Sequence, residues 1–346
     1  MSVSTHACDC LAAAPPVGEV ASGLWVRGQT RYVQRFLGGQ EARLFPASAV
    51  AELRALLAQA GPSGQAELLA TPALATGEPD AWQVRPLAEW LVCLETPWYP
   101  DALQHLTFDV QPIVALGSGT VGAYEALVRA QLGERRVGAG ELLRAAEGHR
   151  HLRSFDAQAR REAIRQAAPL LPAGQQLFIN FAPGVVYNPD VCLQTTFAAC
   201  READIDFQCL VFEVTESERF PDLDMLRRIL ARYRAEGARV ALDDLGAGYT
   251  SLSYLDELRP DIVKLDRALS QNLTPNDPRV GLLAALIAYA HDLEIQVVAE
   301  GVEDLDSLRL LRELGADYAQ GYVLGRPAPT LLPIREEAAA LWSTKT

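Results

Sequence analysis

The sequence predicts an α/β protein whose larger part is a modified TIM (β/α)8 barrel with one antiparallel strand. From residue 104 to residue 346, short β-rich segments alternate with amphipathic helices, which is typical of a parallel sheet covered by helices. Polar residues recur near the ends of these segments, where such barrels collect functional groups. Residues 1–103 differ in composition and predict a separate small α+β module.

The predicted barrel has eight β-rich segments, and the first two of them are joined by a tight turn. The segments are residues 109–116, 120–129, 177–182, 210–216, 239–244, 261–266, 295–301 and 317–323. Helices are expected at residues 155–171, 222–237, 279–294 and 304–315. Only Gly117–Ser118–Gly119 separates the first two segments. Because a parallel crossover needs about a dozen residues, these two must form an antiparallel hairpin.

Pro and Gly interrupt the first 103 residues at several points. A short extended segment is expected at residues 24–26, and helices at residues 46–61 and 86–100. Gly61 ends the first helix, and prolines end the second. The module has no recognisable motif; regulation of the barrel is one role that it could have.

Charge and cysteine content limit the class of protein. The formal net charge of -13 argues against a broad cationic surface for a nucleic acid polymer or an anionic membrane. No apolar run reaches the ~20 residues of a membrane-spanning helix, and no basic segment precedes the short apolar patch at the N-terminus. Six cysteines without a dense framework indicate reduced thiols in a cytoplasmic protein. His6, Cys8 and Cys10 form either a metal or redox site, which Cys93 could complete, or a tail with incidental thiols.

Polar side chains inside the β-rich segments are the main indication of function. They are Glu125, Asn180, Glu213, Asp243, Asp244, Lys264, Glu300 and Gln320, and all except Glu125 lie at or near the C-terminal end of a segment. Singly, each acid could be a helix cap or turn residue, and Lys264 could be a buried, paired lysine.

Together these residues predict a metal site. Carboxylates gathered at one barrel mouth would repel one another and lose hydration unless cations were bound. Oxygen ligands favour Mg2+ or Mn2+ over zinc. The adjacent Asp243 and Asp244 suit two ions that share a carboxylate, and two ions stabilise the attacking and leaving oxygens of a phosphoryl displacement.

The motifs resemble one known family. Residues 108–329 resemble the EAL domain of cyclic di-GMP phosphodiesterases through FDVQPIVAL, YEALVR, FINFAP, FEVTES, ALDDLGAGYTSLSYLDELRPDIVKLDR, VVAEGVE and DYAQGYVLGRP, in that order. The resemblance implies hydrolysis of cyclic di-GMP to linear pGpG with two Mg2+ or Mn2+ ions, by a chain that forms a homodimer.

The resemblance also implies roles for individual residues. The implied metal ligands are Glu125, Asn180, Glu213, Asp243, Asp244 and Glu300. Lys264 would orient or activate the water, Gln320 would support the site, and Glu216 would hold the loop after the double-Asp strand. The implied substrate contacts are Gln111, Leu127, Arg129, Asp266, Glu303 and Tyr322, with Arg129 pairing with a phosphate.

Two departures from the family pattern leave alternatives open. The usual DDFGTG is DDLGAG here, with Leu245 and Ala247, and Leu269 stands near the position of a usual aromatic residue. Either these changes alter activity or regulation, or they are repacking with similar volume. The alternatives to an active phosphodiesterase are a receptor that binds cyclic di-GMP without cutting it and a purely structural interaction protein. The retained carboxylates and Lys264 favour the enzyme.

Overall fold

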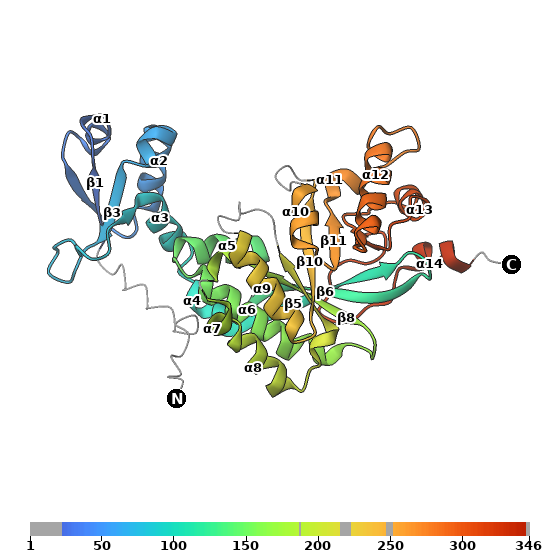
Figure 1. Cartoon of the computed structure of the whole chain (residues 1–346). Coiled ribbons are helices and arrows are strands. Elements are labelled where there is room, and N and C mark those ends of the chain that lie inside the picture. The colour runs from blue at the N-terminus through green and yellow to red at the C-terminus, as the bar shows by residue number, and fades with distance from the viewer. Residues whose placement is uncertain (1–22, 187, 215–222, 247–251, 344–346) are drawn as a thin grey trace. The chain divides into compact units, whose positions relative to one another are not determined.

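The computed structural model describes residues 23–186, 188–214, 223–246 and 252–343 (Figure 1). Within the described residues the chain forms two compact units. The larger contains Thr107–Val128 and the residues from Asp156 onward, and the smaller contains residues 23–106 and Arg129–Phe155. The predicted domain boundary at residues 103 and 104 stays a prediction.

A closed barrel of eight strands forms the larger unit, and one further strand pairs with it. The barrel strands are β5 (Leu106–Ala115), β6 (Thr120–Leu132), β8 (Gln176–Phe181), β9 (Leu210–Val214), β10 (Arg239–Leu245), β11 (Ile262–Leu265), β12 (Gln296–Ala299) and β13 (Tyr318–Gln320). The order is β5-β13-β12-β11-β10-β9-β8-β6, closed by β5–β6 pairing, and the extra strand is β7 (Arg135–Val137). The eight predicted segments are therefore confirmed.

The reversed strand of the prediction is β5. It pairs antiparallel with β13, whereas β6 pairs parallel with β8. The chain reverses between β5 and β6 at Gly119, whose φ of +72° lies in the left-handed region that favours glycine. The amide of Gly119 donates a hydrogen bond of 2.8 Å to the carbonyl of Ala115. The barrel with one antiparallel strand is thus confirmed.

Helices follow most of the parallel strands. The helices of this region are α6 (Leu152–Gln166), α7 (Pro189–Cys192), α8 (Gln194–Ala203), α9 (Leu223–Ala235), α10 (Leu252–Leu258), α11 (Arg267–Ser270), α12 (Arg279–Asp292), α13 (Leu305–Glu313) and α14 (Glu336–Ser343). The helices α6, α9, α12 and α13 confirm the four predicted from apolar periodicity.

The smaller unit has an antiparallel sheet and helices, which confirms the α+β prediction. The sheet has the order β2 (Ala42–Phe45), β1 (Leu24–Gly28), β3 (Leu68–Pro72) and β4 (Arg85–Pro86). Its helices are α1 (Arg31–Gln34), α2 (Val50–Gln65), α3 (Leu87–Glu95), α4 (Tyr99–Ala102) and α5 (Ala139–Gly148).

The helix predicted to end at Gly61 is α2, and its assigned range runs four residues further, to Gln65. Gly61 interrupts the helical conformation with φ +66° and ψ 176°, so the glycine does break the helix as expected. The core of the smaller unit includes Trp90, which is fully buried and donates its indole N–H to the carbonyl of Ala70.

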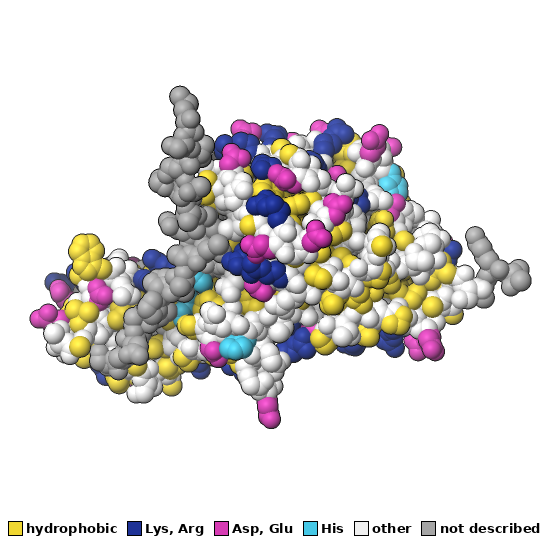
Figure 2. All heavy atoms as spheres, turned by 90° about the horizontal axis from the view of Figure 1, so that it is seen from below, with side chains coloured by type: hydrophobic (Ala, Val, Ile, Leu, Met, Phe, Trp, Pro, Cys, Tyr) yellow, Lys and Arg dark blue, Asp and Glu magenta, His cyan; other side chains and the backbone are white. Residues whose placement is uncertain are grey.

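On the face that Figure 2 shows, Lys and Arg side chains are interspersed with Asp and Glu rather than gathered in one patch. Among the described residues, no helix has both the length and the apolar character needed to cross a membrane.

Candidate active site

The barrel interior places the polar residues in one layer. Below them lies an apolar layer to which every barrel strand contributes one residue: Ile113, Ala123, Phe178, Val211, Ala241, Ile262 and Val298, with Tyr318 packed against them. Because residues two apart on a strand share a face, the next inward positions follow from this layer. On the parallel strands these positions are Glu125, Asn180, Glu213, Asp243, Lys264, Glu300 and Gln320, and on the reversed β5 the position is Gln111.

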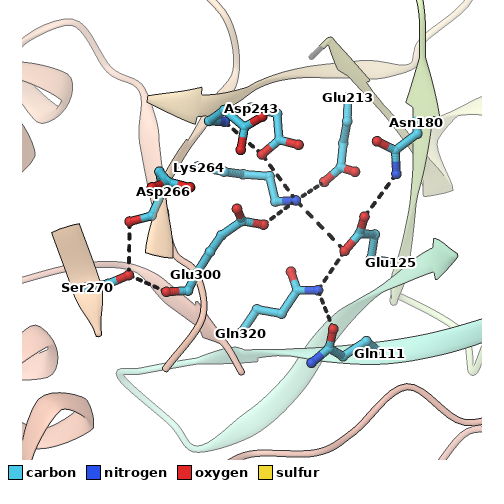
Figure 3. A network of polar contacts seen from close by, with 11 residues as sticks. Gln111, Glu125, Asn180, Glu213, Asp243, Lys264, Asp266, Ser270, Glu300 and Gln320 are labelled. Carbon is cyan, nitrogen blue, oxygen red and sulfur yellow. Dashed lines mark hydrogen bonds and ion pairs between the residues drawn. The ribbon is translucent and has the colours of Figure 1, made fainter. Parts of the chain in front are cut away.

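Lys264 lies at the centre of this polar layer (Figure 3). Its Nζ is 2.5 Å from Oε1 of Glu300 and 2.6 Å from Oε1 of Glu213. The carboxylates of Asp243 and Glu125 are further away, at 3.5 and 3.9 Å. One buried ammonium therefore faces four carboxyl groups, which cannot all ionise without an excess of negative charge in the layer.

Two amides hold Glu125. Asn180 donates from Nδ2 to Oε1 of Glu125 at 2.9 Å, and Gln320 donates from Nε2 to Oε2 at 2.7 Å. The same Nε2 lies 3.1 Å from Oε1 of Gln111, whose own Nε2 donates to the carbonyl of Gly325. The carboxylate of the predicted Glu125 ligand is thus fixed from both sides.

A β-bulge brings the two consecutive aspartates into the site. Between Leu242 and Leu245, β10 contains one residue more than the facing part of β11. Asp244 has φ +60°, a left-handed conformation that Asp adopts more readily than most residues, and its amide donates to Oδ1 of Asp243 at 2.9 Å. Carboxylate oxygens of Asp243, Asp244 and Glu300 consequently lie within 4.8 Å of one another.

Burial and mutual repulsion alter the protonation of these acids. Burial raises the pKa of Glu213 well above its ordinary value, with Lys264 opposing the rise and nearby carboxylates adding to it. Burial also raises the pKa of Glu300 to about 8, and that of Asp244 to about 6 with help from Asp243.

Glu125 and Lys264 shift in the opposite sense, toward their charged forms. Burial alone would raise the pKa of Glu125, but Lys264 and the amide donors Gln320 and Asn180 more than offset it, so this pKa is lowered. For Lys264 burial alone would lower the pKa, but the surrounding carboxylates hold it well above its ordinary value.

The donor set fits divalent cations. Although Lys264 lies close to Glu213, neither carboxylate oxygen of this fully buried Glu213 accepts a hydrogen bond of good geometry from the described residues. A buried carboxylate without such partners is costly, and a bound cation would satisfy it. All of the candidate ligands are oxygen donors, which suits Mg2+ or Mn2+. Asn180 would ligate through its amide oxygen, since its Nδ2 is directed at Glu125.

A pocket of about 250 Å3 opens beside this layer. Its lining includes four of the predicted substrate residues, which are Gln111, Asp266, Glu303 and Tyr322. The other two, Leu127 and Arg129, lie further along β6, are half-buried and do not line this pocket. Arg326 stacks on the Tyr322 ring with its guanidinium carbon 4.2 Å from the ring centroid.

Two residues near the site, Arg267 and Ser270, were not predicted from the sequence. Arg267 lines the pocket and has an exposed side chain, and Ser270 is fully buried and donates to the backbone carbonyl of Glu300. Both lie within six residues of Lys264, in the segment KLDRALS. Their closeness in sequence to Lys264 and Asp266 was the available signal. Leu245 and Leu269 are buried, and Gly246, at φ +106°, is so close to Leu269 that an added Cβ would lie 2.4 Å from Leu269 Cδ1.

Some predicted residues are outside the described part of the chain. These are Glu216, Ala247 and the cluster of His6, Cys8 and Cys10. Cys93, which could have completed that cluster, is buried and donates its thiol to the carbonyl of Gly148 at 3.2 Å.

The family model of the EAL domain matches residues 98–327, so the chain belongs to the EAL domain family. The cyclic di-GMP phosphodiesterase NbdA of Pseudomonas aeruginosa is 32% identical over 228 residues, which are 65% of this chain and 29% of that protein. The cyclic di-GMP phosphodiesterase PdeB of Shewanella oneidensis is 31% identical over 227 residues, 63% of this chain and 26% of that protein. The matched part is thus less than a third of each relative.

Solved structures of similar chains contain the dinucleotide. A standalone versatile EAL protein from Vibrio cholerae O395, in its c-di-GMP-bound form, has a TM-score of 0.60 and 32% identity, with 68% of this chain and 97% of that chain covered. The manganese/cy-diGMP complex of Klebsiella pneumoniae BlrP1 has a TM-score of 0.61 and 28% identity, with 74% and 69% covered.

Proposed function

We propose that the chain is a metal-dependent phosphodiesterase that hydrolyses cyclic di-GMP to linear pGpG. The observation that carries the proposal is the arrangement of four carboxylates around Lys264, those of Glu125, Glu213, Asp243 and Glu300. In the reaction, the oxygen of a water molecule bonds to phosphorus and one ribose P–O bond breaks. The water proton goes to the departing oxygen, which opens the ring.

Each residue of the layer has a role in this proposal. Glu125, Asn180, Glu213, Asp243, Asp244 and Glu300 would hold two Mg2+ or Mn2+ ions. Such ions would supply positive charge to the phosphate oxygens.

The remaining groups would position the water and the substrate. Lys264 would orient the attacking water by donating a hydrogen bond from Nζ, because its raised pKa keeps it protonated. Gln320 keeps Glu125 in place through its 2.7 Å hydrogen bond. Substrate would lie against Gln111, Leu127, Arg129, Asp266, Glu303 and Tyr322, and Glu216 would hold the loop after β10.

The direct test is an assay of the full chain with cyclic di-GMP and either Mg2+ or Mn2+, with pGpG measured by chromatography. We expect pGpG with the wild-type chain and none with Glu125→Ala. Ca2+ is expected to permit binding but not turnover, since its looser coordination misplaces the reacting groups. Tight binding with no turnover in any metal would instead identify a receptor, the alternative that the DDLGAG sequence leaves open.

We also propose that the chain forms a homodimer through α12. The exposed positions between Arg279 and His291 on this helix carry no charge; they are Gly281, Leu282, Ala285, Ala288 and Tyr289. Leu282 is 49% exposed and Tyr289 is 36% exposed, and a second copy would remove both from water. Light scattering should show a dimer that Leu282→Glu converts to a monomer. A wild-type monomer at micromolar concentration would refute the dimer.

A cytoplasmic location and a regulatory role for residues 1–103 remain predictions. Comparison of turnover by the full chain and by a chain that starts near residue 100 would test the second of these.

A further inference from the structure

The short helix α11 follows β11, the strand that carries Lys264, and its last residue, Ser270, contacts the backbone of the candidate ligand Glu300. Ser270 is fully buried. Its hydroxyl donates to the backbone carbonyl of Glu300, and its Oγ is also 3.2 Å from the carbonyl of Asp266 (Figure 3). A serine hydroxyl has one proton, so one buried donor serves the ends of two neighbouring strands.

Both backbone polar atoms of Glu300 are held by the same segment. Its amide donates to the carbonyl of Leu265 at 3.1 Å, and its carbonyl accepts from Ser270. Gly301 follows with φ +61°, and an added Cβ there would lie 2.3 Å from Cβ of Arg267. The turn that starts at Glu300 therefore packs tightly against α11.

The position of the Glu300 backbone matters because its carboxylate completes the oxygen cluster. Oxygens of Glu300, Asp243 and Asp244 lie within 4.8 Å of one another, although Glu300 itself is one residue beyond the end of β12. The amide of Glu300 still donates to β11, at the carbonyl of Leu265, and the Ser270 hydroxyl supplies the hydrogen bond to the Glu300 carbonyl.

We propose that Ser270 is a positioning residue, whose hydroxyl fixes the backbone of Glu300 so that the carboxylate is pre-arranged for a divalent cation. The inference rests on the proposed metal-dependent function. Groups that orient ligands in this way typically contribute 10–100-fold to metal affinity.

Ser307 provides a matched control in the same barrel. It is also fully buried; its hydroxyl donates to Oδ2 of Asp304 at 2.7 Å and accepts from the amide of Leu273 at 2.7 Å. Its hydroxyl therefore supports the fold without touching a candidate ligand. Loss of either hydroxyl should destabilise the chain, but only loss of the Ser270 hydroxyl should weaken metal binding.

The test measures Mn2+ affinity of the full chain without substrate, by electron paramagnetic resonance of free Mn2+. We expect Ser270→Ala to raise the Mn2+ dissociation constant by about 10–100-fold, and Ser307→Ala to change it less than about twofold. Thermal unfolding in chelator compares the two variants without metal. If Ser270→Ala does not fold, Ser270→Cys is the second variant, because a thiol fills a similar volume but is only a weak hydrogen-bond donor. It should show the same loss of Mn2+ affinity.

The outcomes separate this inference from the proposed function. A Ser270→Ala chain that binds Mn2+ as tightly as wild type overturns the inference, even if wild type cleaves cyclic di-GMP. Weakened Mn2+ binding in Ser270→Ala, with a wild-type chain that never yields pGpG, supports the inference and overturns the proposed function. A wild-type chain that binds no Mn2+ overturns both.

Discussion

The two ends of the barrel treat buried and half-buried charge in opposite ways. At the C-terminal end of the strands, one cation, Lys264, faces four carboxylates. At the opposite end, Arg239 donates to the side-chain oxygens of Gln176 and Gln296 and to the carbonyl of Asp261. Arg239 is thus satisfied by neutral acceptors.

Acids show the same contrast. At the N-terminal ends of the strands, Asp261 accepts from the amide of Val240 at 2.9 Å and contacts Arg234, while Asp317 accepts from the amide of Val297 at 2.7 Å and contacts His291. Each of these acids pins its own strand to the neighbouring one. At the mouth, four carboxylates share Lys264, and neither oxygen of Glu213 accepts a hydrogen bond of good geometry from the described residues. One end of the barrel is thus arranged for stability, and the acids of the other end suit a cationic ligand.

The largest expected effect compares the central cation of each end. Lys264→Ala should lower turnover of cyclic di-GMP about 10²–10³-fold, the range for loss of one preorganised hydrogen-bond donor. Arg239→Ala should destabilise the fold but leave turnover per folded molecule within about twofold, because Arg239 donates to neutral groups at the end of the barrel opposite the site. Steady-state kinetics, corrected for the folded fraction, measure both. Near-normal turnover in Lys264→Ala would remove the functional half of the comparison.

Bound Mn2+ should stabilise the folded chain through the acids at the barrel mouth and not through those at the opposite end. At a Mn2+ concentration about 100 times its dissociation constant, the free energy of unfolding should rise by about 2.7 kcal/mol, and chelator should reverse the rise. For a domain of this size, that corresponds to an increase in melting temperature of about 5–10 °C. Asp243→Asn should lose most of the increase, whereas Asp261→Asn should keep it. An equal increase in both variants would show that Mn2+ binds elsewhere.

Without metal, stability should depend on pH through the mouth acids. Because the folded pKa values of Glu300 and Asp244 are raised to about 8 and about 6, these two sites bind more protons in the folded chain than in the unfolded chain. Their contribution to stability is fully present at low pH and is lost as pH rises, to about pH 6 for Asp244 and about pH 8 for Glu300, by up to about 1.4 kcal/mol per pH unit for each acid within its own range.

Urea unfolding at several pH values in chelator measures this slope. Saturating Mn2+ should flatten it, because ligated carboxylates stay ionised. Glu300→Gln should also reduce the slope in chelator, since it removes the acid whose pKa is raised to about 8. A metal-free stability that rises with pH over this range would contradict the proposed repulsion among the mouth acids.

Most of the fold and the ligand layer follow from the alternation of strand residues, in which side chains two positions apart face the same side. In VGAYEAL, LFIN and LVFEV, a polar residue stands two positions after an apolar or small one that faces the barrel axis, so Glu125, Asn180 and Glu213 share one layer. The reversed strand followed from the three-residue turn at Gly117–Ser118–Gly119. Local pattern was sufficient wherever the strand ladder itself fixes the side chain.

Features that depend on contacts between distant segments were not predictable in this way. The bulge at Asp244 appears only in the pairing of β10 with β11. The role of Ser270 depends on a carbonyl thirty positions away, at Glu300. The sheet of the smaller unit was also largely missed, because β2 and β4 are short and their residues lack strict alternation.

The smallest expected effect comes from replacing one acid at each end of the barrel by its neutral amide. The free energy of unfolding should change in opposite directions at the two ends. Asp317→Asn keeps an acceptor for the amide of Val297 but loses the charge beside His291, so it should destabilise the chain by about 1 kcal/mol. Glu300→Gln at pH 8 in chelator should instead stabilise it, because it relieves repulsion among the mouth acids. Urea unfolding of both variants measures the two signs. The same sign in both would mean that the mouth acids are no less satisfied than those at the opposite end.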